Sequence, residues 1–106
     1  MSDYLPDVYV RVRDAYPEVS DALGRLGRAT EAAGPLADRE QRLAKLGIAI
    51  GALADGAVRS NVRKCLGVGV TPDEIRHVAL LAITTRGFPA AVAAMAWIDE
   101  VLAQEA

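Results

Sequence analysis

Two segments in the second half of the chain are apolar on nearly every side. "VALLAI" runs from Val78 to Ile83, and "AAVAAMAWI" runs from Ala90 to Ile98. A helix that is apolar all round must be buried all round. A chain of 106 residues has too little interior to surround two such helices completely. We therefore expect subunits to share these helices in an obligate homo-oligomer.

The proline and glycine positions are typical of an all-helical protein. Prolines stand near the starts of segments and glycines stand at their ends: Pro6, Pro17, Pro72 and Pro89, and Gly34, Gly69 and Gly87. Six helices are predicted, near residues 5–15, 18–33, 38–54, 57–67, 72–86 and 89–104. Apolar residues make up 52% of the chain and aromatic residues only 5%, so Ala, Val, Leu and Ile must form most of the core. We expect one all-α domain over residues 1–106, with leading helices in 1–35 and a core in 36–104.

The clearest helix start in the sequence is "TPDE". Thr71 can cap the helix, Pro72 suits its first position, and Glu74 can complete a capping box. The predicted helix over 38–54 carries one apolar stripe at three- and four-residue steps, formed by Leu43, Leu46, Ile50 and Leu53. Gly47 and Gly51 follow two residues of this stripe, and we expect their missing side chains to let another helix approach closely.

Charge and cysteine content exclude several classes of protein. The formal charge is -2, from 12 basic and 14 acidic residues, and no basic patch is interleaved with aromatic residues, so we expect no nucleic-acid partner. A lone cysteine cannot form an intramolecular disulfide, and the N-terminus lacks the order of a signal peptide. No uncharged apolar run reaches the roughly 18 residues that a membrane span needs. These features predict a cytoplasmic protein with no membrane partner.

Three stretches carry a more specific signal. They read "LADREQRLAKLGIAIGALADG", "VRSNVRKCLGVGVTPDEI" and "ALLAITTRGFPAAVAAM", within about Leu36 to Leu102, and their most specific parts are "GVTPDEI" and "GFPAAV". Their combination resembles the carboxymuconolactone decarboxylase and AhpD-like alkylhydroperoxidase superfamily. This resemblance implies small subunits with an AhpD-like helical fold that assemble into dimers, trimers or hexamers of dimers. It agrees with the oligomer expected from the two apolar helices.

The resemblance also implies a redox site whose residues are replaced in this chain. The peroxidase branch uses a Cys-x-x-Cys pair at a helix start, a histidine one turn later and a glutamate on the preceding helix as a proton relay. Counted without gaps, Ala54 and Ala57 take the cysteine places, Asn61 takes the histidine place, and Arg42 takes the glutamate place. The decarboxylase branch keeps the histidine as its acid-base group, and an asparagine cannot exchange a proton near neutral pH. We therefore expect neither chemistry, and the four replaced positions become the candidate ligand-binding site.

Two arginines and the asparagine are the main candidates for holding a ligand. Arg42 and Arg59 would both face the cleft between the third and fourth helices if the family packing holds. A guanidinium in place of a carboxylate turns a proton acceptor into an anion clamp, which would suit a small carboxylate. A surface position, or an intersubunit ion pair with Asp38, Glu40 or Asp55, is the alternative for these arginines. Asn61 either caps a backbone carbonyl or holds a substrate through its amide.

Cys65 and His77 are secondary candidates. Cys65 lies in the apolar arc of the fourth predicted helix, where it is either a buried small hydrophobe or a reactive thiol. His77, the only histidine, lies on the polar side of the fifth predicted helix, which favours a solvent or interface position. One histidine with scattered acids does not supply a metal-ligand set, so we expect neither a metal nor another cofactor.

Two functions from different classes are consistent with these residues. In the first, the family cleft binds a small carboxylate or lactone-like molecule, or turns it over with Arg42 and Asn61, without redox chemistry. In the second, only the oligomeric scaffold is retained, and Ala54 and Ala57 fill the former site. The remaining alternative is an active lyase or peroxidase-type enzyme that uses substituted residues, such as Cys65 alone.

Overall fold

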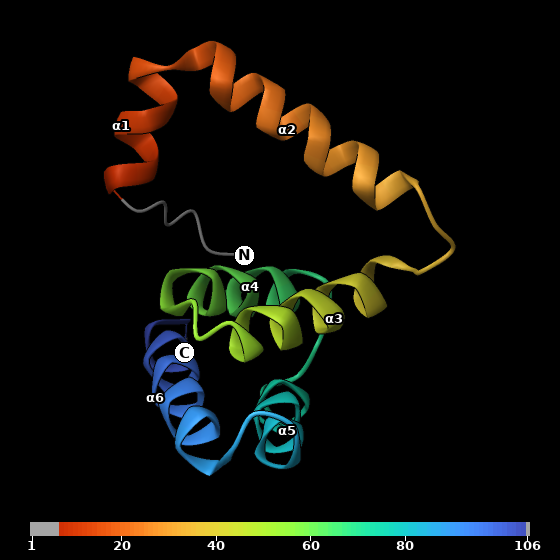
Figure 1. Cartoon of the computed structure of the whole chain (residues 1–106), viewed down its shortest axis with the longest axis vertical. Helices are drawn as coiled ribbons and strands as arrows, with labels where there is room; N and C mark the ends of the chain where they lie inside the picture. Colours follow the sequence, from red (N-terminus) through yellow and green to blue (C-terminus); the bar gives the residue numbers. More distant parts are fainter. Residues whose placement is uncertain (1–6, 106) are drawn as a thin grey trace. The chain divides into compact units, whose positions relative to one another are not determined.

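The computed structural model describes residues 7–105, and all of its regular structure in this range is helical. The elements, labelled in Figure 1, are α1 (Asp7–Ala15), α2 (Pro17–Ala32), α3 (Asp38–Gly51), α4 (Asp55–Gly67), α5 (Pro72–Leu81), the short 3-10 helix η1 (Ala82–Thr84) and α6 (Phe88–Glu105). The prediction of an all-α fold with six helices is confirmed. The first two residues of the helix predicted over 5–15 lie outside the described range.

Helix α3 ends earlier than the sequence predicts. It stops at Gly51, and the chain turns through Ala52 and Leu53 before α4 begins at Asp55. Leu53 has a φ of 52°, a left-handed conformation that cannot continue a right-handed helix. The assignment of Leu53 to the apolar stripe of α3 was therefore wrong.

Helix α5 also ends before residue 86, because the chain tightens into η1. The backbone N–H groups of Thr85, Arg86 and Gly87 all donate to the carbonyl oxygen of Ala82. Gly87 has a φ of 111°, which favours glycine, and α6 begins at the next residue. This turn brings the apolar segments of α5 and α6 side by side in the same part of the fold, where their helices pack together.

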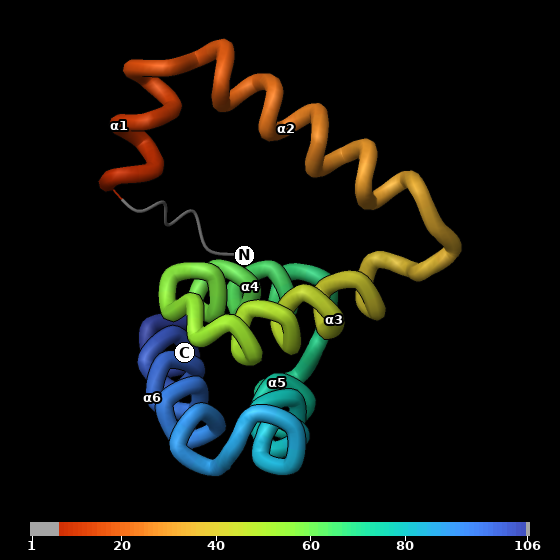
Figure 2. The backbone as a smooth tube through the Cα atoms, viewed as in Figure 1, coloured from red at the N-terminus to blue at the C-terminus, as the bar shows by residue number. Residues whose placement is uncertain are grey.

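The described residues separate into two compact units, 7–36 and 37–105. The N-terminal unit contains α1 and α2 and has no buried residue in either helix. The core unit contains α3 to α6. In Figure 2, α3 and α4 run in opposite directions as a hairpin, and α6 packs against both α4 and α5.

The centre of the core unit is built from aliphatic side chains. Those with no more than 1% exposure include Leu46 and Ile50 of α3, Val58 and Val62 of α4, Ile75 of α5, and Ile98 and Val101 of α6. Alanines also face this centre, among them Ala49, Ala79 and Ala94. The predicted dominance of small aliphatic residues is thus confirmed, since no aromatic side chain belongs to the buried cluster in the described range.

The start of α5 has the capping box that the sequence predicts. The Thr71 hydroxyl accepts a hydrogen bond from the Glu74 backbone N–H at 3.2 Å, and the Glu74 carboxylate accepts one from the Thr71 backbone N–H at 2.9 Å. The same carboxylate pairs with Arg39 on α3. The Arg39 guanidinium, helped by the Thr71 N–H, lowers the pKa of Glu74 from 4.5 to about 2. Glu74 therefore joins the start of α5 to the start of α3.

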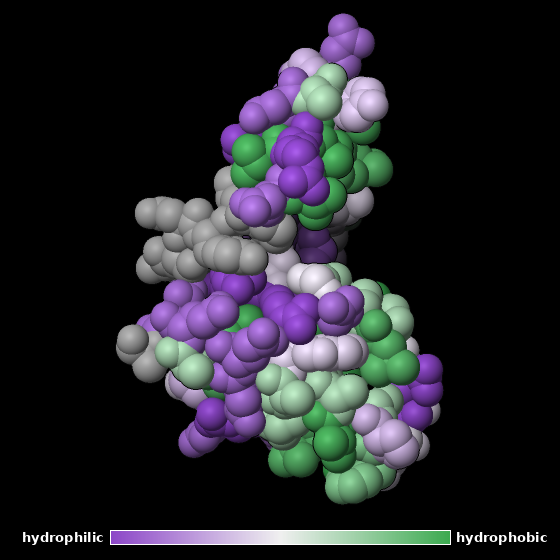
Figure 3. Space-filling view, turned by 90° about the vertical axis from the view of Figure 1, so that its left-hand side faces the viewer, coloured by the Kyte–Doolittle hydropathy of each residue, from purple (hydrophilic) through white to green (hydrophobic). Residues whose placement is uncertain are grey.

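One end of the core unit exposes a continuous set of apolar side chains. This apolar end consists of Leu80, Leu81, Phe88 and Val92, each more than half exposed. Figure 3 shows hydrophobic side chains gathered at this end of the core unit. None of the described helices combines the length and apolar character that crossing a membrane requires.

Leu46→Ala should lower the free energy of unfolding by about 2–5 kcal/mol, because it opens a cavity at the centre of the α3–α4 contact. Ile48→Ala is the matched control, since Ile48 lies on the same helix but is 71% exposed; its effect should stay within about 0.5 kcal/mol. Urea unfolding measures both values. Equal losses in the two variants would contradict the assignment of Leu46 to the core.

The ion pair between Glu74 and Arg39 predicts a loss of stability in acid. Because the folded-state pKa of Glu74 lies below its ordinary value, its contribution is complete above about pH 4.5 and is lost as the pH falls towards 2. Glu74→Gln keeps an oxygen for the capping box but removes the charge. Urea midpoints should therefore favour the unmodified protein at pH 6 and converge with those of Glu74→Gln near pH 2. A constant difference across this range would contradict the ion pair.

Candidate functional site

The four family positions lie on α3 and on the first two turns of α4. Arg42 is half-buried on α3, Ala54 is the N-cap residue of α4, Ala57 is exposed in the first turn, and Asn61 is half-buried one turn later. Helices α3 and α4 pack directly against each other. The expected placement of these positions on two neighbouring helices therefore holds.

The Asn61 side chain is hydrogen-bonded to the backbone of its own helix. Its side-chain Nδ2 donates to the Ala57 carbonyl oxygen at 2.9 Å, which is the carbonyl-capping role considered from the sequence. Its Oδ1 is buried and has no hydrogen-bond partner within the described range. Leaving a buried acceptor unmet costs about 1–3 kcal/mol, which offsets what the bond to Ala57 contributes.

Cys65 lies entirely inside the core, with no exposed surface. Burial raises the pKa of its thiol, and the positive charges of Arg42 and Arg39 offset this only in part. A thiol must lose its proton before it can attack peroxide. The position of Cys65 therefore matches a buried small hydrophobe.

Arg59 is engaged with α6 and with the start of its own helix. Its Nε donates to Glu100 at 2.9 Å, its Nη1 donates to Asp55 at 3.0 Å, and its guanidinium carbon lies 6.0 Å from the centre of the Trp97 ring. The expectation that Arg59 joins Arg42 at the α3–α4 cleft is thus replaced by a structural role between α4 and α6. The i,i+4 spacing of Asp55 and Arg59 was a sequence signal for their ion pair, whereas Glu100, 41 residues from Arg59, could not be recognised as a partner.

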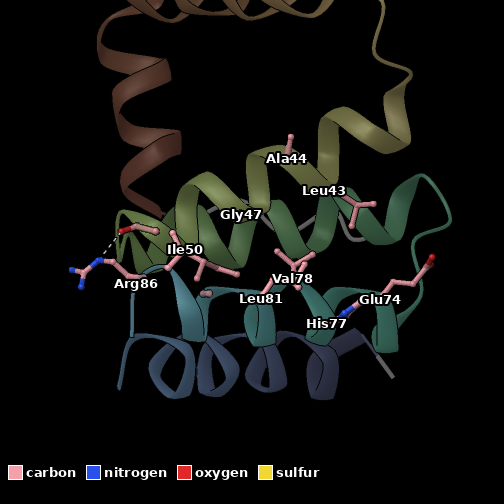
Figure 4. A pocket seen from close by; sticks show the side chains of 12 residues that line it. Leu43, Ala44, Gly47, Ile50, Glu74, His77, Val78, Leu81 and Arg86 are labelled. Atoms are coloured by element: carbon pink, nitrogen blue, oxygen red, sulfur yellow. Dashed lines mark hydrogen bonds between the residues drawn. The ribbon is translucent and has the colours of Figure 1, made fainter. Parts of the chain in front are cut away.

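A groove of about 550 Å³ runs between α3 and α5 (Figure 4). Apolar residues form its wall: Leu43, Ala44, Ile50, Val78, Leu81 and Ala82. Polar side chains lie at its two ends, with Arg86 at one end and Glu74 and His77 at the other. His77 is exposed, as predicted, but the sequence did not indicate that it borders a groove.

The groove exists because two glycines of α3 face it. A Cβ atom at Gly47 would meet only Val78, at 3.8 Å, and a Cβ atom at Gly51 would meet nothing within 4 Å. At Gly47, α5 therefore approaches to contact distance through Val78, whereas at Gly51 the expected close approach of another helix was wrong, because open space lies there. Their spacing of one helical turn was the available signal for a groove.

Arg86 is fixed at the mouth of the groove by one hydrogen bond. Its Nε donates to the Gly51 carbonyl oxygen at 3.1 Å, from the turn between η1 and α6 to the end of α3. A guanidinium has five N–H donors, and this bond uses one. The family positions Arg42, Ala54, Ala57 and Asn61 are not among the residues that line this groove.

The core unit also has a second, smaller groove. This groove of about 250 Å³ lies between the end of α5 and α6, and its lining, which includes Phe88 and Met95, is entirely hydrophobic in residue type. Among residues 7–105, no group of three or more His, Cys, Asp or Glu side chains is placed to hold a metal ion.

The thiol of Cys65 should react slowly in the folded protein. Burial both blocks access and disfavours the thiolate, so labelling by a disulfide reagent at pH 8 should be slow until the protein unfolds. Addition of 6 M guanidinium should make labelling fast and complete. Fast labelling without denaturant would contradict the buried position.

A family model matches most of the chain. The model of the carboxymuconolactone decarboxylase family matches residues 17–100, from the start of α2 into α6. The match begins earlier than the resemblance noted from Leu36, since it includes α2. No curated protein matches the chain at a significant level. Because the family model matches residues 17–100, this chain belongs to the carboxymuconolactone decarboxylase family.

Proposed function

We propose that this chain binds a small carboxylate or lactone-like molecule with an apolar body, in the α3–α5 groove, and that it works without redox chemistry. The groove is the observation that carries the proposal. Its volume of about 550 Å³ lies within the roughly 300–1,000 Å³ that is typical of small-molecule sites. Its wall is apolar and its ends are polar, so it suits a ligand with an apolar body and a charged or polar end.

Arg86 is the residue that would hold a carboxylate. Its bond to Gly51 holds the Arg86 side chain at one end of the groove. Charge-assisted hydrogen bonds to a carboxylate are stronger than neutral ones. Glu74 cannot take this role, because its carboxylate is already paired with Arg39 and would repel an anion. The acid end of the ligand is therefore expected near Arg86, with the apolar body along Gly47 and Val78.

The residues at the family relay positions support a function without proton transfer. Ala54 and Ala57 carry no titratable group, and Asn61 uses its amide N–H for a backbone carbonyl. The one thiol is buried at Cys65. A relay needs a thiolate and a base within reach of each other, and these side chains offer neither.

A homo-oligomer is part of the same proposal. The apolar end places four large side chains in water in the single chain, and such patches on soluble proteins commonly mark interfaces. A second subunit would bury these side chains of α5 and α6. Leu80, Phe88 and Val92 of this interface line the small apolar groove, whereas Leu81 lines the wall of the α3–α5 groove.

Octanoate should raise the melting temperature of the unmodified protein, because a ligand that binds only the folded state adds about 2.7 kcal/mol at a hundredfold excess over its dissociation constant. Gly47→Leu should abolish the shift by filling the groove. Gly56→Leu is the matched control, since it adds the same side chain to a helix where nothing lies within 4 Å. Arg86→Ala should weaken binding about tenfold or more.

Three further arms separate the alternatives. A shift that survives in Gly47→Leu but is lost in Arg42→Ala would place the ligand at the family cleft and contradict the groove. No shift with octanoate, other mono- and dicarboxylates or γ-lactones would favour the scaffold function. Consumption of hydrogen peroxide with a dithiol, lost in Cys65→Ser, would contradict a protein without redox chemistry.

A further inference from the structure

Helix α2 has an apolar face that nothing in its own unit covers. It spans sixteen residues, none of them buried, and Tyr16, Val19, Leu23 and Leu26 along it are each more than 60% exposed. An isolated helix of this length is only marginally stable in water. Gly24 and Gly27 weaken it further, by about 1 kcal/mol each relative to alanine. The helix therefore needs a partner surface for its apolar face.

The apolar face of α2 is a narrow, continuous stripe. Val19, Ala22, Leu23 and Leu26 recur at three- and four-residue steps, which places them on one side of a helix that turns 100° per residue. Glu18 and Arg25, seven residues apart, border one edge of this stripe. Gly27 borders the other edge, and no atom lies within 4 Å of the Cβ position there. One edge of the stripe thus carries an acid followed by a base. The other edge has no side chain at Gly27, so another helix can approach it closely.

We propose that α2 pairs antiparallel with α2 of a second copy of this chain. With the two-fold axis near Ala22 and Leu23, Val19 of each copy faces Leu26 of the other. The same alignment brings the two charged edges together, so Glu18 of each copy lies beside Arg25 of the other and the dimer has two opposite-charge pairs. A parallel pair would instead set the charged edge of each copy beside the Gly27 edge of the other, and these charge pairs would be lost.

The charges of α2 make a second copy a better partner than a lipid surface. Helices that lie on membranes are rich in Lys and Arg on their polar face. The polar side of α2 instead carries both signs, with three acids and two arginines: Glu18, Asp21 and Glu31, and Arg25 and Arg28. The residues of this interface all belong to α2 and include none that line the α3–α5 groove or form the apolar end, so its test does not depend on the proposed ligand or on that oligomer contact.

Cysteine cross-linking in the full-length protein tests the pairing. Leu23→Cys should form a covalent dimer on mild oxidation, because the two residues meet near the two-fold axis. Arg28→Cys is the control, since position 28 lies on the opposite side of α2. The unmodified protein, whose only thiol is the buried Cys65, controls for background. Covalent dimer from Arg28→Cys at the same rate as from Leu23→Cys would overturn the proposal, as would no dimer from either.

Charge exchange on the Leu23→Cys background tests the antiparallel order. Glu18→Arg or Arg25→Glu alone should slow cross-linking about three- to tenfold, because each creates two like-charge contacts. The double variant should restore the original rate. Circular dichroism confirms that the helices are retained in each variant. Single variants that cross-link at the original rate, or a double variant that stays slow, would show that α2 rests on another surface.

Discussion

The core unit depends on the packing of α3. This helix contacts α4, α5 and α6. Leu46 and Ile50 are buried in these contacts, and alanines on α5 and α6 let the helices approach without large side chains between them. Arg59 adds a polar tie from α4 to α6. Because this core is aliphatic and tightly packed, it fixes the position of α3, and α3 in turn supplies residues to both candidate sites.

The two faces of α3 have different consequences for function. Arg42 is half-buried on α3, and its positive charge acts on Cys65 of α4. Gly47 and Gly51 face α5, and their missing side chains leave the groove open. The family model spans this helical frame, from α2 into α6. A ligand function in the neighbouring groove requires no change of that frame.

Local features could be predicted from the sequence, and contacts between distant segments could not. The start of α5 is decided within four residues, so the capping box of Thr71 and Glu74 is as predicted. The end of α3 depends on the left-handed turn at Leu53, and a leucine in the sequence does not predict that conformation. The partner of Arg59 and the openness beside Gly47 depend on how α6 and α5 pack. The apolar pattern of α5 and α6 predicts a surface shared between subunits. It did not predict which residues of these helices are exposed in the single chain.

A ligand in the α3–α5 groove would contact different residues from a ligand at Ala54, Ala57 and Asn61. Chemical-shift mapping by NMR, with octanoate titrated into isotope-labelled protein, separates the two because it locates the ligand residue by residue. We expect saturable shifts of the Gly47 and Gly51 amides and of the Val78 methyl groups, with little change at Asn61. Saturable shifts confined to Asn61 and its neighbours on α4 would contradict it.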